Sequence, residues 1–134
     1  MDAFVLNLTS SGNALVYSIL LGGEEVDFAR DLALGNDGTV VIGGVTTGLG
    51  FPITPGAYNT NNTDENRNAF VTRIALDGSS FLYSTLLGGS YEEDGYGVAM
   101  DSQGSAYIMG ISDSFDFPTT SGAYDPTPIS LSQY

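Results

Sequence analysis

The chain has 134 residues, with 16 acidic side chains, three arginines (Arg30, Arg67 and Arg73) and no lysine, histidine or cysteine, so its formal net charge is −13. Without cysteine or histidine there are no disulfides, no thiolate nucleophiles and none of the commonest general bases and metal ligands. So acidic a chain is a poor match for nucleic acid. No apolar run approaches the roughly 20 residues of a membrane span, and the first residues lack the charged start of a signal peptide. We therefore expect no nucleic-acid partner and no membrane insertion.

The composition favours an all-β fold. Hydrophobic residues make up 42% of the chain and charged residues only 14%, which is too apolar for a disordered segment. The 18 glycines, together with many Ser, Thr and Asn residues, favour turns, whereas the residues that usually fill surface helices are scarce.

An internal repeat organises the whole sequence. A shift of 66 positions aligns the two halves without a gap and gives 20 identities over 57 pairs. The matched segments include Ala3-Phe4-Val5 with Ala69-Phe70-Val71, and Leu20-Leu21-Gly22-Gly23 with Leu86-Leu87-Gly88-Gly89. We therefore divide the chain into two repeat units, 2–67 and 68–134.

Each unit contains four strand-like runs in the same order. Turn signals such as Asp77-Gly78, whose residues tolerate a positive φ, separate the runs. In chain order, the predicted strands are Ala3–Leu8, Leu15–Leu21, Asp31–Leu34 and Thr39–Val45, then Ala69–Ile74, Phe81–Leu87, Gly97–Met100 and Ser105–Ile111.

The fourth strand of each unit indicates how the sheets stack. Val40 and Ile42 alternate with Val41 and Val45, so neither face of this strand is polar. A strand that is apolar on both faces must be covered on both sides. Four-stranded sheets stacked face to face around an axis, as in a β-propeller, meet this requirement. A parallel β-helix has much shorter coils, and an eight-stranded sandwich is the other alternative.

These residues resemble the bacterial SBBP repeat, a β-propeller repeat family. The second unit carries the pattern in Ala69-Phe70-Val71, Tyr83-Ser84, Leu87-Gly88-Gly89, Ala99, Asp101, Gly104, Tyr107, Gly110 and the segment 116–124. The first unit has Gly35, Val41 and Gly50 where the second has Asp101, Tyr107 and Asp116. The resemblance implies two four-stranded antiparallel propeller blades, no catalytic motif, and a place in secreted or cell-surface bacterial proteins.

The resemblance also implies that the chain starts halfway through a blade. It would run as an outer strand pair, a full blade and an inner strand pair, leaving a half-blade at each end. Two blades cannot close a ring, because propellers have about four to eight. We therefore expect a homo-oligomer with an even blade total, or neighbouring repeats of a longer chain.

Acidic residues follow each Gly-Gly pair and are the candidate metal ligands. They are Glu24, Glu25 and Asp27 in the first unit, and Glu92, Glu93 and Asp94 in the second. Several carboxylates in one loop suit Ca²⁺, which takes six to eight oxygen ligands. Calcium is thus the only cofactor candidate, and a solvated connector is the alternative.

Two other features have structural interpretations. The repeated Phe-Pro…Gly-Ala-Tyr segments, Phe51–Tyr58 and Phe117–Tyr124, are expected to fix the connection between blades, with the tyrosine hydroxyl docked on the backbone. Arg30 beside Asp31 suggests a local ion pair, or a contact to an anion or a partner.

The sequence favours a non-catalytic propeller module that acts as a scaffold or binding domain, with a protein or glycan as its ligand. A lectin-like module, in which Tyr, Asn and Asp side chains on one rim grip a sugar, is the second hypothesis. A carboxylate-based glycoside hydrolase ranks last, because no pair of carboxylates separates an acid from a base.

Overall fold

The computed structural model describes residues 1–60 and 66–127, which form eight β-strands and no helix. In these two ranges there is accordingly no helix long and apolar enough to cross a membrane. The strands are β1 (Ala3–Leu8), β2 (Leu15–Leu21), β3 (Asp27–Leu34), β4 (Val40–Thr46), β5 (Asn68–Ile74), β6 (Phe81–Leu87), β7 (Glu93–Met100) and β8 (Ala106–Ser112).

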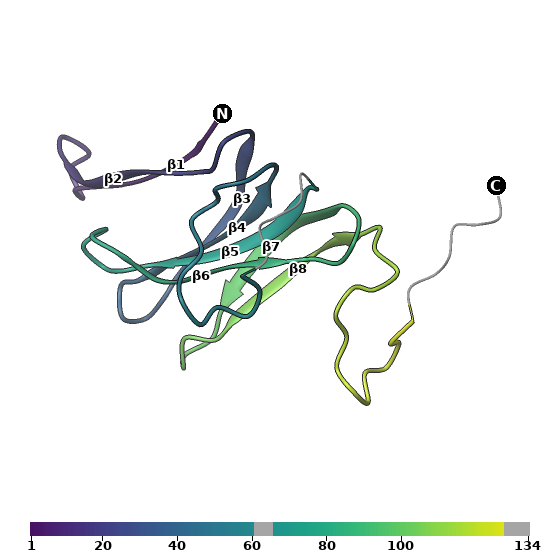
Figure 1. Cartoon of the computed structure of the whole chain (residues 1–134). Coiled ribbons are helices and arrows are strands. Elements are labelled where there is room, and N and C mark those ends of the chain that lie inside the picture. Colours follow the sequence, from purple (N-terminus) through teal and green to yellow (C-terminus); the bar gives the residue numbers. More distant parts are fainter. Residues whose placement is uncertain (61–65, 128–134) are drawn as a thin grey trace.

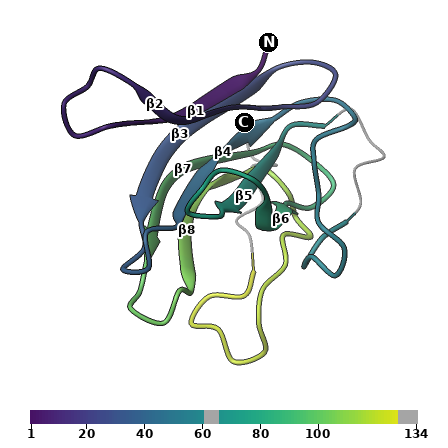
Figure 2. The same cartoon turned by 90° about the vertical axis from the view of Figure 1, so that its left-hand side faces the viewer.

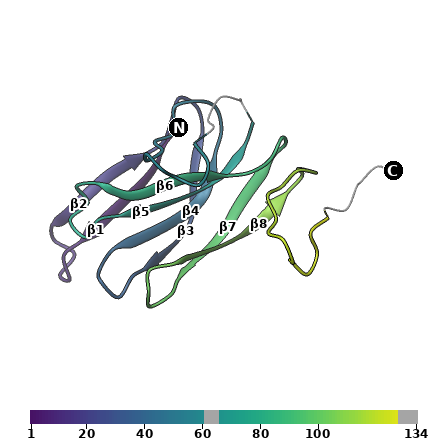
Figure 3. The same ribbon diagram turned by 60° about the horizontal axis from the view of Figure 1, so that its bottom comes forward.

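The strands form three antiparallel sheets stacked as layers (Figure 1). The central sheet has four strands in the order β3-β4-β5-β6, as in a propeller blade, and the hairpins β1-β2 and β7-β8 are separate two-stranded sheets. Figure 3 shows the order of the layers, with β1-β2 on one side of the central sheet and β7-β8 on the other. Figure 2 shows the same layers from the side, with β1-β2 running along the top.

Each face of the central sheet has its own apolar core. Ile42, Phe70 and Leu86 pack with Ala3, Val5 and Leu21 of the β1-β2 hairpin. On the opposite face, Val41 and Val71 pack with Val98 of β7. All seven residues of β4 are buried. The prediction of a strand covered on both sides is therefore confirmed for β4, and it follows from the apolar character of both faces. It does not hold for β8 in the second unit, where Tyr107, Met109 and Ile111 are exposed.

The predicted strands are correct to within one residue except at the starts of β3 and β7. Both strands begin four residues earlier than expected, at Asp27 and Glu93. A β-bulge interrupts each strand, at Arg30 in β3 and at Tyr96 in β7, and breaks the alternation on which the prediction depended. Asp27, Glu93 and Asp94 therefore lie in strands, and the expectation that they lie in a connector is wrong.

The sequence units and the sheets are out of phase by half a unit. The central sheet takes β3 and β4 from the first unit and β5 and β6 from the second, joined by a regular β4-β5 ladder from Val40 opposite Ile74 to Thr46 opposite Asn68. The expected order of outer pair, full blade and inner pair is therefore what the structure contains. The unit boundaries themselves, 2–67 and 68–134, include residues outside the described ranges and stay a prediction.

Candidate functional site

Two of the candidate metal ligands are buried and brace the Gly-Gly turns. The Gly23 N–H donates to Asp27 Oδ2 at 2.9 Å, and the Gly89 N–H donates to Glu93 Oε2 at 3.1 Å. Both acidic side chains are 1% exposed. The same position in each unit therefore holds its turn in the same way.

The two braces differ in their second oxygen. Glu93 Oε1 accepts a hydrogen bond from the Ser112 hydroxyl at 2.7 Å. Asp27 is one methylene shorter, and its Oδ1 and the Oγ1 of the facing Thr46 are both buried without a hydrogen-bond partner among the described residues. The brace in the first unit is therefore only half satisfied, which is costly for buried polar atoms.

The remaining candidate ligands point elsewhere. Glu24, Glu25 and Glu92 are exposed, and Asp94 Oδ1 forms an ion pair with Arg67 at 2.5 Å. Within residues 1–60 and 66–127, no three acidic side chains come together in a group that could hold a metal ion. The six residues therefore form no single cluster, and calcium binding stays a prediction.

Arg30 and Asp31 also take separate partners. The Arg30 guanidinium lies over the Phe28 ring, 5.1 Å from its centroid. Asp31 Oδ2 accepts a hydrogen bond from the Val98 N–H at 2.9 Å, which ties β3 to β7 in the next layer. The expected local ion pair is therefore replaced by a cation–π contact and a link between sheets.

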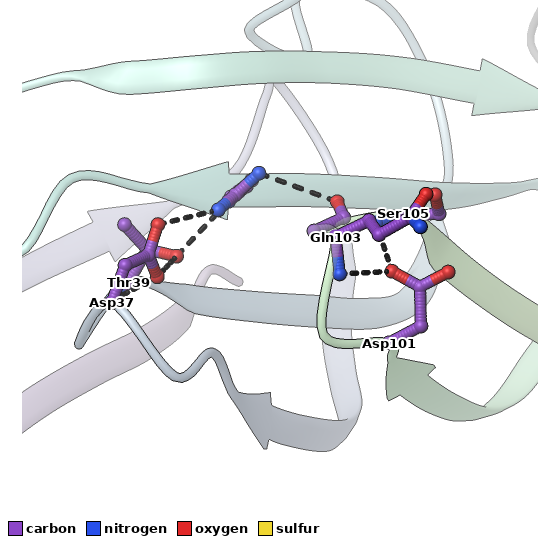
Figure 4. Close-up of polar contacts among 7 residues, drawn as sticks. Asp37, Thr39, Asp101, Gln103 and Ser105 are labelled. Carbon is purple, nitrogen blue, oxygen red and sulfur yellow. Dashed lines mark hydrogen bonds and ion pairs between the residues drawn. The ribbon is translucent and has the colours of Figure 1, made fainter.

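The most developed polar site lies where the β3-β4 and β7-β8 turns meet, around a hollow of ≈ 260 Å³ that we call the rim pocket. Its lining is Asn36, Asp37, Arg73, Met100, Asp101, Ser102, Gln103 and Gly104. Arg73, from β5, donates to Asp37 Oδ2 at 2.8 Å, to Thr39 Oγ1 at 3.0 Å and to the Gly104 carbonyl at 3.3 Å (Figure 4). One arginine thus joins the turns of two layers.

Each turn of the rim pocket is closed by an aspartate. Asp37 Oδ1 accepts from both the N–H and the hydroxyl of Thr39, and Asp101 Oδ1 accepts from the N–H groups of Gln103 and Ser105 (Figure 4). The aspartate stands two residues later in the first turn than in the second. The first unit has Gly35 at the position of Asp101, and Asp37 closes its turn instead.

These hydrogen bonds keep the rim carboxylates ionised. The hydroxyl and N–H of Thr39, with Arg73 adding its charge, hold the pKa of Asp37 below 3.8. The Ser105 and Gln103 N–H groups lower the pKa of Asp101, and the Val98 N–H lowers that of Asp31. A lowered pKa favours the ionised carboxylate, which accepts hydrogen bonds at neutral pH.

Sequence reasoning identified the turns but missed Arg73. The available signal was one charged residue in a strand predicted to be buried, because the charged end of such a side chain must reach polar groups at the end of the strand. Tyr107 is a further member of the site, since its hydroxyl contacts Asp101 Oδ2 at 3.3 Å.

The Phe51–Tyr58 segment connects β4 to β5, as expected, and Phe117–Tyr124 follows β8, but the tyrosines of both segments do not dock. Phe51 is buried and its ring lies 4.6 Å from that of Phe70. Thr54 donates from its N–H to the Ser84 carbonyl at 3.0 Å, which fixes the segment along β6. Tyr58 is 71% exposed and Tyr124 fully exposed, so the expectation of a docked hydroxyl is wrong.

Comparison with known proteins identifies one repeat. Residues 82–118 match the SBBP family model, described as a beta-propeller repeat. The matched range runs from β6 through β8 to Pro118 and includes the Gly88-Gly89 turn with its Glu93 brace. A search of curated proteins found no match.

Proposed function

Because residues 82–118 carry an SBBP beta-propeller repeat, we propose that the chain is a non-catalytic propeller module that acts as a scaffold or binding domain. The carrying observation is the central sheet, which is buried on both faces between sheets of its own kind. Stacked blades of this kind present turns at their rims, where ligands meet repeat proteins.

The state of the carboxylates supports a role without catalysis. A glycoside hydrolase needs one carboxylic acid whose pKa is raised so that it can protonate the leaving group. The pKa values of Asp31, Asp37, Asp77, Asp101 and Asp116 are all lowered by hydrogen bonds from neighbouring N–H or hydroxyl groups. These side chains are suited to holding turns and accepting hydrogen bonds.

A lectin-like module is the second candidate, and the rim pocket favours it. Asn36 and Gln103 line the pocket together with Asp37, Arg73 and Asp101, and the exposed Tyr107 contacts Asp101 beside it. A few polar groups with an aromatic side chain beside them suit a small polar ligand such as a sugar.

A glycan array discriminates between the two candidates. A reproducible saccharide hit that is lost in Gln103→Ala, but kept in Ser79→Ala at the β5-β6 turn, would assign the rim pocket to sugar binding. An array without hits would favour the scaffold over the lectin-like module. Turnover of a chromogenic glycoside that one Asp→Asn change abolishes would overturn both proposals.

We further propose that the module works in a secreted or cell-surface protein, as the resemblance to SBBP repeats suggests, with calcium as the candidate ligand of the acidic residues near the Gly-Gly turns. Unfolding by heat in calcium and in chelator tests the calcium proposal, because an ion that binds only the folded state must raise the midpoint.

A further inference from the structure

The two end hairpins are complementary halves of one blade. With the shift of 66 residues, β1-β2 corresponds to β5-β6, the outer pair of the central sheet, and β7-β8 corresponds to β3-β4, the inner pair. In the central sheet these two pairs are joined by the β4-β5 ladder. Each end hairpin is therefore the kind of strand pair that the other would need to form a four-stranded blade.

Side chains that the central layer buries are exposed at both ends. Phe4 and Leu20 are 66% and 71% exposed, whereas their counterparts Phe70 and Leu86 are fully buried. At the other end, Tyr107 is 62% exposed, whereas its counterpart Val41 is fully buried. The faces of β1-β2 and β7-β8 are thus built for a neighbour of the same kind.

Each open strand edge borders an apolar groove where the missing hairpin would lie. One groove, of ≈ 450 Å³, runs between β1 and β3 and is lined by Phe4, Val5, Leu6, Ala29, Arg30, Asp31, Leu32 and Ile42. The other, of ≈ 350 Å³, lies between β8 and the outer half of the central sheet, with Ala69, Leu87, Ile108, Met109, Ile111 and Phe117 among its lining residues. The first groove lacks a strand like β8, and the second lacks a strand like β1.

Neither open edge carries the features that prevent strand pairing. β1 (Ala3–Leu8) and β8 (Ala106–Ser112) contain no charged residue and no proline. Natural edge strands usually carry charges, prolines or bulges that turn other strands away. Both edges are therefore competent to add a strand.

We propose that β8 of one copy pairs antiparallel with β1 of a second copy and so completes a four-stranded blade across the subunit boundary. This inference rests on the propeller interpretation in the proposed function. The β4-β5 ladder sets the register. It places Ala106 opposite Leu8, Tyr107 opposite Asn7, Ile108 opposite Leu6, Met109 opposite Val5, Gly110 opposite Phe4 and Ile111 opposite Ala3.

The connector after β8 supplies a second contact. In the complete blade, the connector after β4 packs Phe51 on Phe70 and bonds Thr54 to the Ser84 carbonyl of β6. The same segment after β8, Phe117–Tyr124, is exposed except for the half-buried Ala123, because its own sheet has no outer pair. The composite blade would place Phe117 on the second copy's Phe4 and Thr120 on its Ser18.

The bulky side chain at Met109 is compatible with this packing. In the central sheet Asp31 faces Gly43, whereas in the end hairpin Gly97 faces Met109. A Cβ at Gly97 would lie 2.7 Å from the Met109 Cε, so the methionine occupies the space that the glycine leaves. Each pair thus contains one glycine and one larger side chain, and the thickness of the layer is kept.

The contact is head to tail, because β8 and β1 lie at opposite ends of the stack. Such contacts close into a ring when their rotation closes and otherwise make open filaments. Each copy contributes the strands of two blades, so two, three or four copies give four, six or eight blades, within the usual range of propellers.

Directed disulfide formation tests the register, since the chain has no cysteine of its own. Asn7→Cys and Tyr107→Cys, mixed in equal amounts and oxidised, should yield a cross-linked dimer, because directly opposed Cβ atoms lie within or near disulfide reach. The control replaces Tyr107→Cys by Met109→Cys, which is at least as exposed but two residues out of register. That pair should cross-link at least tenfold less.

The mass in solution is the second measurement. Light scattering should give two, three or four times the 14.0 kDa chain mass, and raised salt should favour assembly by screening the −13 charge. Leu6→Lys, on the exposed face of β1, should reduce the mass to one copy with the β-sheet circular dichroism spectrum retained. Leu82→Lys, exposed in the complete blade, should leave the assembly unchanged.

A folded monomer at every salt concentration, equal cross-linking in and out of register, or disulfide dimers that join only two copies of the Asn7→Cys variant would each overturn the proposal. The proposed function would survive such a result, because its tests, glycan binding and glycoside turnover, do not depend on assembly. Loss of the β-sheet spectrum in the unmodified chain would remove both.

Discussion

Replacing Glu93 distinguishes a structural brace from a metal ligand. Glu93→Ala removes the acceptors of the Gly89 N–H and the Ser112 hydroxyl. Hydrogen bonds of this kind contribute about 1–3 kcal/mol each, and Ser112 is exposed enough to bond to water instead. We therefore expect the free energy of unfolding to fall by about 2–4 kcal/mol. Asp27→Ala, which removes one such bond, should cost less.

Urea unfolding followed by circular dichroism measures this loss. With an m-value of about 2 kcal/mol per molar, in the middle of the range for small proteins, the midpoint should fall by about 1–2 M at unchanged slope. The matched control is Glu92→Ala, an exposed neighbour that should change stability by less than about 0.5 kcal/mol.

The same titration in calcium and in chelator completes the test. If Glu93 is only a structural brace, Glu93→Ala should lower the free energy of unfolding by the same amount in both solutions. Equal effects of Glu93→Ala and Glu92→Ala would refute the bracing role, and a loss confined to the calcium solution would instead establish Glu93 as a ligand.

Three further results are expected. Hydrogen bonds lower the folded-state pKa values of Asp37 and Asp101 below 3.8, so these ionised carboxylates contribute fully to folding stability above that pH and lose the contribution as the pH falls through the folded-state pKa values. The urea midpoint of the protein should therefore fall below about pH 4. It should fall less steeply in the double variant Asp37→Asn/Asp101→Asn. Gly44→Ala would place a Cβ 2.0 Å from the Phe28 carbonyl oxygen, and it should lower the thermal midpoint by an amount equivalent to about 1–3 kcal/mol. Gly43→Ala would place its Cβ 3.3 Å from the Val98 Cβ, and it should destabilise the protein by less than about 1.5 kcal/mol. Equal thermal midpoints for the two variants would contradict the close approach of β3 and β4. Arg73→Met should increase hydrogen exchange at both rim turns, Gly35–Thr39 and Asp101–Ser105, and a change in one turn only would show that the arginine does not join the layers.

The sequence predicted the architecture well because repetition and alternation are both local signals. The apolar residues on both sides of β4 required two covering layers, and the layers are present. The out-of-phase order of half, full and half blades also followed, from the resemblance of the third and fourth strands to an inner pair.

The site was less predictable, since its contacts join residues that are distant in sequence. Arg73 reaches Asp37 and Gly104, more than thirty residues away in either direction. The bulges at Arg30 and Tyr96 hid the starts of β3 and β7, so the buried Asp27 and Glu93 were assigned to a connector. A bulge has no reliable signature in residue type, because it depends on how two strands pair.

The half-unit offset between sequence copies and sheets has a consequence for how such a protein can change length. The first and second repeat units meet between β4 and β5, which pair with each other in the central sheet. Inserting one more repeat unit there would keep every kind of strand neighbour and would add one layer to the stack. Deleting one repeat unit would likewise leave an outer strand pair at one end of the stack and an inner strand pair at the other. Growth and loss by whole copies are thus geometrically permitted, whereas an insertion of any other length would leave strands mismatched.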